Sequence, residues 1–246
     1  MVQASFELNH LFLNEFAIDL ILEFAREKKA LDFRHVNFEA LKILLEIVFE
    51  KNIFRFKSHF YKQKKGFAMG VTCGPACANI VVYMLEKKWL HINRPKVYRR
   101  FIDDVALITN QLIDLDKFKK VFGSLRLNIE FGHEIHFLDL KIIYDPTFRK
   151  ISTTLYIKPT NTFSYLSVNS NHKPSIFKNI PFSLLIRVKR SCSENFDFFF
   201  FSRLLVSQLR LRGYCHFFLM SVVRRVSNLE RKNLLPYKKN KSLSIS

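Results

Sequence analysis

Two adjacent carboxylates, Asp103 and Asp104, lie between two runs of strand-like residues, 97–101 and 105–109. Neighbouring side chains of a strand point to opposite faces, so an uninterrupted strand would turn one carboxylate into the core. Because a buried carboxylate without a partner is costly, we expect the pair at the bend of a hairpin, near solvent or a cation. No Gly or Asn eases that turn, which predicts a strained connection. Taken alone, the pair is more typical of two solvated turn aspartates.

A glycine-bearing loop precedes this hairpin. Three of the six glycines fall within the nine residues from Gly66 to Gly74. Glycine lets the backbone approach a flat partner closely, such as a base pair or a sugar. Pro75 suits the first turn of the helix expected over 76–89. Followed by the aspartate hairpin, the loop is a strong functional signal; the alternative is an ordinary loop that enters a helix.

Hydrophobic spacing predicts an α+β fold, with hairpins and helices packed on one sheet. Helices are expected over 16–29, 37–51, 76–89 and 115–125, and strands over 4–12, 53–56, 59–63, 97–101, 105–109, 128–131, 136–144 and 151–157. From about residue 159 the chain becomes polar, then helical and basic. We therefore expect two regions, a core of sheet and helices over 1–158 and a basic, mostly helical region over 159–246.

The charge of the chain is strongly positive and uneven. Lys and Arg number 40 against 21 Asp and Glu, a net charge of +19. The segment 147–246 holds 18 Lys and Arg and only three acids, so it carries +15. Such a field attracts polyanions, and nucleic acid is the commonest large one. A solubilising surface or a patch at a membrane surface is the alternative.

Composition excludes several other classes of protein. An apolar fraction of 48%, with 27 Phe, argues against disorder of the whole chain. The cysteines form no C-x-x-C pair, so neither structural zinc nor a disulfide framework is expected. No basic region precedes the apolar N-terminal residues, so we expect no signal peptide. Four charges interrupt the apolar stretch 196–223, which argues against a membrane-spanning helix and a membrane partner.

Taken together, the motifs resemble those of one enzyme family. The segment 63–79, QKKGFAMGVTCGPACAN, resembles the B motif of reverse transcriptases, and 99–105, RRFIDDV, resembles their C motif. Further stretches are similar to the region that follows the palm in Penelope-like retroelements: 137–142, 155–162, 165–166, 170–174, 180–182, 187–193 and 212–214. The resemblance extends from about residue 4 to residue 214.

The resemblance implies an RNA-directed DNA polymerase, with a palm over 1–158 and a thumb-like region over 159–246. Its partners would be an RNA template, a DNA primer and deoxynucleoside triphosphates, and its cofactor Mg²⁺ or Mn²⁺. The family likeness also suggests the nucleus. It gives the metal ligands as Asp103, Asp104, Glu7 and the backbone carbonyl of Leu8.

Other roles are carried over from the family in the same way. Phe12 falls where the family keeps an aromatic residue that screens the sugar 2′ position. The residues expected under the templating base pair and the incoming nucleotide are Gln63, Gly66, Met69, Gly70, Pro75 and Asn79. The cations expected to meet phosphates of the template and primer are Lys158, Arg187, Lys189 and Arg190. For any single one of these cations, a solvated surface charge is the competing interpretation.

The chain also departs from the family pattern. The family opens its palm with Ser-Phe-Asp, whereas this chain has Ser5-Phe6-Glu7, and about three residues of the pattern are missing after Asn14. We expect the fingers and the C-terminal GIY-YIG nuclease to be absent from these residues. Glutamate keeps the charge but moves the carboxylate by a methylene, so we predict little or no polymerase activity.

Two other hypotheses stay open at this stage. The chain could bind nucleic acid without catalysis, through its basic C-terminal region. It could also be a decayed fragment of an element with no selected role, which the phenylalanine run 198–201 and the gap after Asn14 favour.

Overall fold

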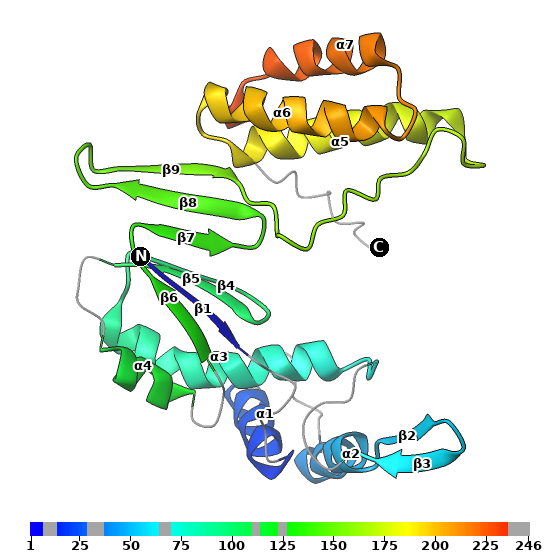
Figure 1. The fold of residues 1–246 in the computed structure, drawn as a ribbon. Coiled ribbons are helices and arrows are strands. Elements are labelled where there is room, and N and C mark those ends of the chain that lie inside the picture. Colours follow the sequence, from blue (N-terminus) through cyan, green and yellow to red (C-terminus); the bar gives the residue numbers. More distant parts are fainter. Residues whose placement is uncertain (7–13, 29–36, 64–69, 110–113, 123–126, 236–246) are drawn as a thin grey trace, which may run out of the picture. The chain divides into compact units, whose positions relative to one another are not determined.

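The computed structural model describes residues 1–6, 14–28, 37–63, 70–109, 114–122 and 127–235 (Figure 1). The chain divides into two compact units, Met1–Gly132 and His133–Ser246. The sequence placed the boundary after residue 158. The observed boundary, after Gly132, instead places the strands that follow it in the same unit as the C-terminal helices.

The first unit contains a four-stranded antiparallel sheet with the order β4-β5-β1-β6. Its strands are β1 (Val2–Phe6), β4 (Val97–Phe101), β5 (Asp104–Ile108) and β6 (Leu127–Phe131). The N-terminal strand is therefore central, with Ser5 opposite Asp104 of β5 on one side and Asn128 of β6 on the other. Its described part is shorter than the strand expected over 4–12, because residues 7–12 lie outside the described ranges.

Four described helices pack with this sheet to form the hydrophobic core of the first unit. They are α1 (Asn14–Lys28), α2 (Phe38–Glu50), α3 (Gly74–Asn93) and α4 (Leu115–Val121). Val81 and Val82 of α3 are fully buried, and the Trp89 ring meets the Phe118 ring edge-on at 4.8 Å between centroids. Asn37, at the predicted start of this helix, caps α2 by accepting hydrogen bonds from two backbone amides of the first turn.

A separate two-stranded hairpin leaves the end of α2. It consists of β2 (Ile53–Phe56) and β3 (His59–Lys62), which form a two-stranded sheet of their own among the described strands. Figure 1 draws it projecting from the end of α2. Both strands are exposed along their whole length.

The second unit combines an antiparallel meander with helices. The strands are β7 (Glu134–Phe137), β8 (Leu140–Asp145) and β9 (Lys150–Leu155), and the helices are α5 (Pro174–Ser191), α6 (Asn195–Arg210), α7 (His216–Ser227) and α8 (Arg231–Leu234). The prediction of one strand over 136–144 is wrong, because the chain turns at Leu138, whose φ is 56°, and so forms two strands. The phenylalanine run lies in α6, where Phe198 is buried in the helical core and Phe199 and Phe200 are exposed.

None of the helices within the described ranges combines the length and the apolar character needed to cross a membrane.

Candidate functional site

The two adjacent aspartates lie at the bend of the β4–β5 hairpin, as the sequence predicts. Phe101 pairs with Asp104, so Ile102 and Asp103 form the connection. Asp103 is exposed and Asp104 is half-buried. Ile102 has φ 54°, a left-handed conformation that is unfavourable for a β-branched residue. The expectation of a strained connection is confirmed.

The end of β1 lies beside this bend. Ser5 is opposite Asp104, and Phe6 is the last described residue of the strand. The predicted ligands Glu7 and Leu8, and the predicted sugar-screening residue Phe12, lie outside the described residues.

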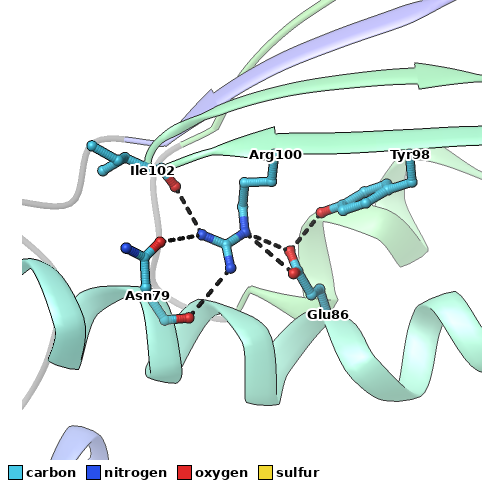
Figure 2. Close-up of polar contacts among 5 residues, drawn as sticks. All are labelled: Asn79, Glu86, Tyr98, Arg100 and Ile102. Atoms are coloured by element: carbon cyan, nitrogen blue, oxygen red, sulfur yellow. Dashed lines mark hydrogen bonds and ion pairs between the residues drawn. The ribbon is translucent and has the colours of Figure 1, made fainter. Parts of the chain in front are cut away.

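A buried hydrogen-bond network joins the bend to α3 (Figure 2). The Arg100 guanidinium donates from Nη1 to Asn79 Oδ1 at 2.7 Å and to the Ile102 carbonyl at 3.1 Å, and from Nη2 to the Asn79 carbonyl at 3.3 Å. Arg100 Nε meets both Glu86 carboxylate oxygens, at 3.2 and 3.0 Å. The Tyr98 hydroxyl donates to Glu86 Oε2 at 2.6 Å.

Alternation and helix periodicity explain this arrangement. Tyr98 and Arg100 are two residues apart on β4 and point to the same face, toward α3. Asn79 and Glu86 are seven residues apart, two helical turns, and so lie on one face of α3. The Glu86 and Arg100 side chains are only 7% and 12% exposed. Burial and the neighbouring carboxylate raise the pKa of the Tyr98 hydroxyl.

The network ties the backbone of the aspartate bend to the helix that follows the glycine loop. Neither Arg100 nor Glu86 is among the site residues predicted from the sequence. One signal could have found Glu86, because it is an acid on the stripe of α3 that also carries the buried Val82 and Trp89.

The glycine loop is partly described. Gly70 has φ 94°, and no atom of the described residues lies within 4 Å of a Cβ added to it, so its backbone conformation is what favours glycine here. Pro75 stands in the first turn of α3, as predicted. The backbone amide of Gln63 donates to the Asn52 carbonyl at 2.9 Å. Gly66 and Met69 lie outside the described residues. Asn79, predicted to face the nucleotide, uses its side-chain oxygen to hold Arg100.

The donor atoms at the bend suit a hard divalent cation. Mg²⁺ prefers oxygen ligands, and Asp103 and Asp104 offer carboxylates at the accessible end of the hairpin. Among the residues that the structure describes, no three His, Cys, Asp or Glu side chains gather into a metal site. The third predicted side-chain ligand, Glu7, is not among them.

Of the four cations predicted to meet phosphates, one is buried. Lys189 is 8% exposed; its ammonium donates to Asn195 Oδ1 at 3.2 Å and lies 4.7 Å from the centre of the Phe198 ring. A phosphate cannot reach this ammonium, so the role predicted for Lys189 is wrong. The side chain instead holds α5 to α6 within the helical core.

The other three cations are accessible. Lys158 is exposed. Arg187 donates from Nε to Asp139 Oδ2 at 2.6 Å, and Arg190 donates from Nε to the Leu234 carbonyl at 2.7 Å. The pair between Arg187 and Asp139 is partly solvated, with the two side chains 57% and 36% exposed.

Gly213 lies where the loop that precedes α5 packs against the turn between α6 and α7. Its φ is 88°, and an added Cβ would lie 2.6 Å from Val168 Cγ2. The Val168 amide donates to the Arg212 carbonyl at 3.1 Å, and Tyr214 is buried. The segment 212–214 is therefore a packing motif within the helical unit.

The comparison with protein families concerns the second unit. A family model described as an animal helix-turn-helix domain matches residues 164–219, which contain α5, α6 and the start of α7. A search of curated proteins finds no match. The chain is thus similar to a helix-turn-helix family over a minor part of its length.

Proposed function

We propose that the chain is the palm and thumb-like part of an RNA-directed DNA polymerase related to those of Penelope-like retroelements. It extends a DNA primer on an RNA template by nucleotidyl transfer, and Glu7 impairs that reaction. The register of β1 against β5 is the observation that carries the proposal. It brings Ser5, two residues before Glu7, opposite Asp104, so carboxylates from two separate strands can converge.

The packing of α3 supports the same proposal. The segments that resemble the B and C motifs, 63–79 and 99–105, are separate in the sequence but adjacent in the fold, because Arg100 of the hairpin binds Asn79 of α3. A polymerase needs such an arrangement, with the surface under the nascent base pair fixed against the carboxylates. Arg100 belongs to the segment that resembles the C motif and Asn79 to the segment that resembles the B motif, so the contact joins the two segments directly.

The carboxylates at the bend would be metal ligands. Asp103, Asp104 and Glu7, with the Leu8 carbonyl, would hold Mg²⁺ or Mn²⁺. When bound, such ions stabilise the charge on the attacking and leaving oxygens of phosphoryl transfer. Arg100 fixes the backbone of the bend that presents the carboxylates.

The remaining site residues would hold the substrates. The segment containing Gly66, Met69, Gly70 and Pro75, with Gln63 beside it, would lie under the templating base pair. Phe12 would screen the sugar of the incoming deoxynucleotide. Lys158, Arg187 and Arg190 would meet phosphates of the template and primer.

Glu7 is the reason to expect weak activity. Its additional methylene moves the carboxylate along the side chain by roughly a bond length, and a misplacement near 1 Å can cost about 10²-fold in rate. The charge at the site is preserved while the position of the ligand is not.

A second function, binding of nucleic acid without catalysis, rests on a different observation. The match to a helix-turn-helix family covers 164–219, and the segment 147–246 carries a net charge of +15. In DNA-binding helix-turn-helix proteins the second helix enters the major groove. Such binding would be steeply salt-dependent and would survive replacement of Asp103 and Asp104.

Primer extension on poly(rA)–oligo(dT) with Mg²⁺ or Mn²⁺ separates the two functions. We expect Glu7→Asp to extend the primer about 10²-fold faster than the wild-type chain. Asp103→Ala in the Glu7→Asp background is the matched control and should abolish extension. If the folded Glu7→Asp protein binds the substrate but incorporates nothing, the polymerase proposal is wrong and binding alone is retained.

A further inference from the structure

The β2–β3 hairpin, residues 53–62, presents an unusual set of side chains to solvent; we call it the aromatic ribbon. Cross-strand pairing brings Phe54 opposite Tyr61 and Phe56 opposite His59. Because paired residues share a face, all four rings lie on one side of the ribbon. The Phe54 and Tyr61 rings stack, with 5.6 Å between centroids and 19° between planes.

Exposure on this scale is costly unless something covers the rings. The exposed fractions are 53% for Phe54, 60% for Phe56, 72% for Phe60 and 46% for Tyr61. Large apolar patches that are left open on a soluble protein commonly mark binding surfaces. The ribbon therefore points to a partner that accepts flat, accessible rings.

The charge of the ribbon identifies the class of partner. It contains Arg55, Lys57 and Lys62 and no acidic residue. The Lys57 ammonium lies 5.7 Å from the centre of the Phe56 ring, and the Arg55 guanidinium lies 5.9 Å from the centre of the Phe60 ring. Arg55, Lys62 and Phe60 lie on the face opposite the four rings, because side chains alternate along each strand, so each face of the ribbon places a cation near a ring. Such a surface suits single-stranded nucleic acid, since bases stack while phosphates pair. Cores of protein–protein interfaces are instead depleted in lysine.

The ribbon is anchored at its base, and its tip is ordered by an internal hydrogen bond. At its base, Asn52 donates from Nδ2 to the Val48 and Phe49 carbonyls at the end of α2, at 2.8 and 3.2 Å. Phe49 itself is 2% exposed, so this end of α2 is anchored in the core. At the tip, Lys57 has φ 55°, and Arg55 Nε donates to its carbonyl at 2.9 Å. A ligand that binds such a preorganised surface loses less binding energy to ordering it.

We propose that the aromatic ribbon binds single-stranded RNA, stacking unpaired bases on its rings and pairing phosphates with Arg55, Lys57 and Lys62. The identity of the strand rests on the proposed function, in which RNA is the template. The chain itself supports this choice, because β3 ends one residue before Gln63, where the proposed template-contacting segment begins. The ribbon would receive the part of the template that is not paired with primer.

The test measures the affinity for a fluorescein-labelled oligouridylate by anisotropy, without metal or deoxynucleotides. The double variant Phe54→Leu, Phe56→Leu removes two rings and keeps the strands apolar. We expect its Kd to rise by at least about fivefold and up to about 100-fold, with the slope of log Kd against log salt unchanged, because stacking releases no counterions.

Two further variants make the result specific. Lys57→Gln with Lys62→Gln should reduce the salt slope by about 0.7 for each cation while the rings still stack. Phe148→Leu replaces a 78% exposed ring at the turn between β8 and β9 and should leave Kd unchanged. Far-UV circular dichroism establishes that each variant keeps its secondary structure.

Two outcomes would overturn the proposal. The first is an unchanged Kd for the folded double variant, or an equal loss for Phe148→Leu. The second is a dimer of the wild-type chain in sedimentation velocity that the double variant abolishes while RNA binding persists, since the rings would then serve a second copy of the chain. Neither depends on nucleotide incorporation, so failure of primer extension leaves this test intact.

Discussion

Arg100 carries a buried charge that is compensated by several hydrogen bonds. Its guanidinium satisfies Glu86, the Asn79 side chain and two backbone carbonyls, those of Asn79 and Ile102. The adjacent Arg99 is exposed and donates only to the carbonyl of Tyr98 in the described contacts. Two successive arginines of one strand therefore have very different expected contributions to stability.

Replacing Arg100 by Ala should lower the free energy of unfolding by about 3–5 kcal/mol, because Glu86 would remain buried without its partner. Urea unfolding monitored by circular dichroism measures the change. Arg99→Ala is the matched control and should shift stability by less than about 0.5 kcal/mol.

A double variant distinguishes pairing from packing. If the loss comes from the unpaired carboxylate, Arg100→Met with Glu86→Leu should recover much of the stability lost in Arg100→Met alone. Equal losses in the single and double variants would contradict this explanation.

At the scale of elements, the packing of the loop before α5 against the turn between α6 and α7 depends on the absence of a side chain at Gly213. Gly213→Ala must tolerate both a left-handed φ and a contact of 2.6 Å with Val168 Cγ2. Gly70→Ala faces the same conformational strain with open space around the Cβ. Comparing the two substitutions therefore distinguishes the cost of backbone strain from the cost of steric conflict.

Gly70→Ala should cost about 1–2 kcal/mol and Gly213→Ala visibly more, by about 1–3 kcal/mol. Thermal unfolding of the two variants makes the comparison. Adding Val168→Ala to Gly213→Ala should remove part of the excess relative to Val168→Ala alone; if it does not, the contact with Val168 is not what Gly213 protects.

Local patterns predicted most elements of this fold. Asn37 caps α2 because an asparagine before an amphipathic run is a local signal, and the aspartate bend follows from the cost of burying a carboxylate. The break at Leu138 escaped prediction, since the residues around it continue the apolar pattern of a strand and only their backbone conformation departs from it.

Long-range contacts were beyond the reach of such patterns. The order β4-β5-β1-β6 depends on the pairing of β1 with β5 and β6, strands about 100 and about 125 residues further along the chain, which periodicity does not encode. Lys189 was predicted at a phosphate from the family resemblance, yet the side chain is buried, where a ring and an amide compensate its charge. The predicted roles of Glu7, Leu8, Phe12, Gly66 and Met69 stay predictions.

At the scale of the whole molecule, buried thiols and phenols in both units share one pH response. Burial and the neighbouring Cys73 raise the pKa of Cys77 from 9.0 to about 12, and burial raises the pKa of Cys192 and of Tyr214. In each case the folded state keeps a proton that the unfolded chain releases. The stability these groups contribute is fully present below the unfolded pKa and is lost as pH rises toward the folded pKa.

We therefore expect the free energy of unfolding to be insensitive to these groups near neutral pH and to fall above about pH 9, by up to about 1.4 kcal/mol per pH unit for each thiol. Urea unfolding at a series of alkaline pH values measures the slope. Cys77→Ala should make it shallower, whereas Cys215→Ala, at an exposed position, should not. An equal slope in all three proteins would show that Cys77 does not titrate this way.

The central place of β1 has a consequence for how the protein is made. β1 leaves the ribosome well before its partners β5 and β6, which end at Ile108 and Phe131. At about 5–20 residues per second, β1 waits on the order of ten seconds before both neighbours have been synthesised. During that time β1 lacks one or both of the strands that it pairs with, and only local structure, such as helices and hairpins, can form. Slow synthesis or a stalled ribosome would lengthen this interval, so nascent chains of this protein should depend on chaperones that hold extended segments until the last strand arrives.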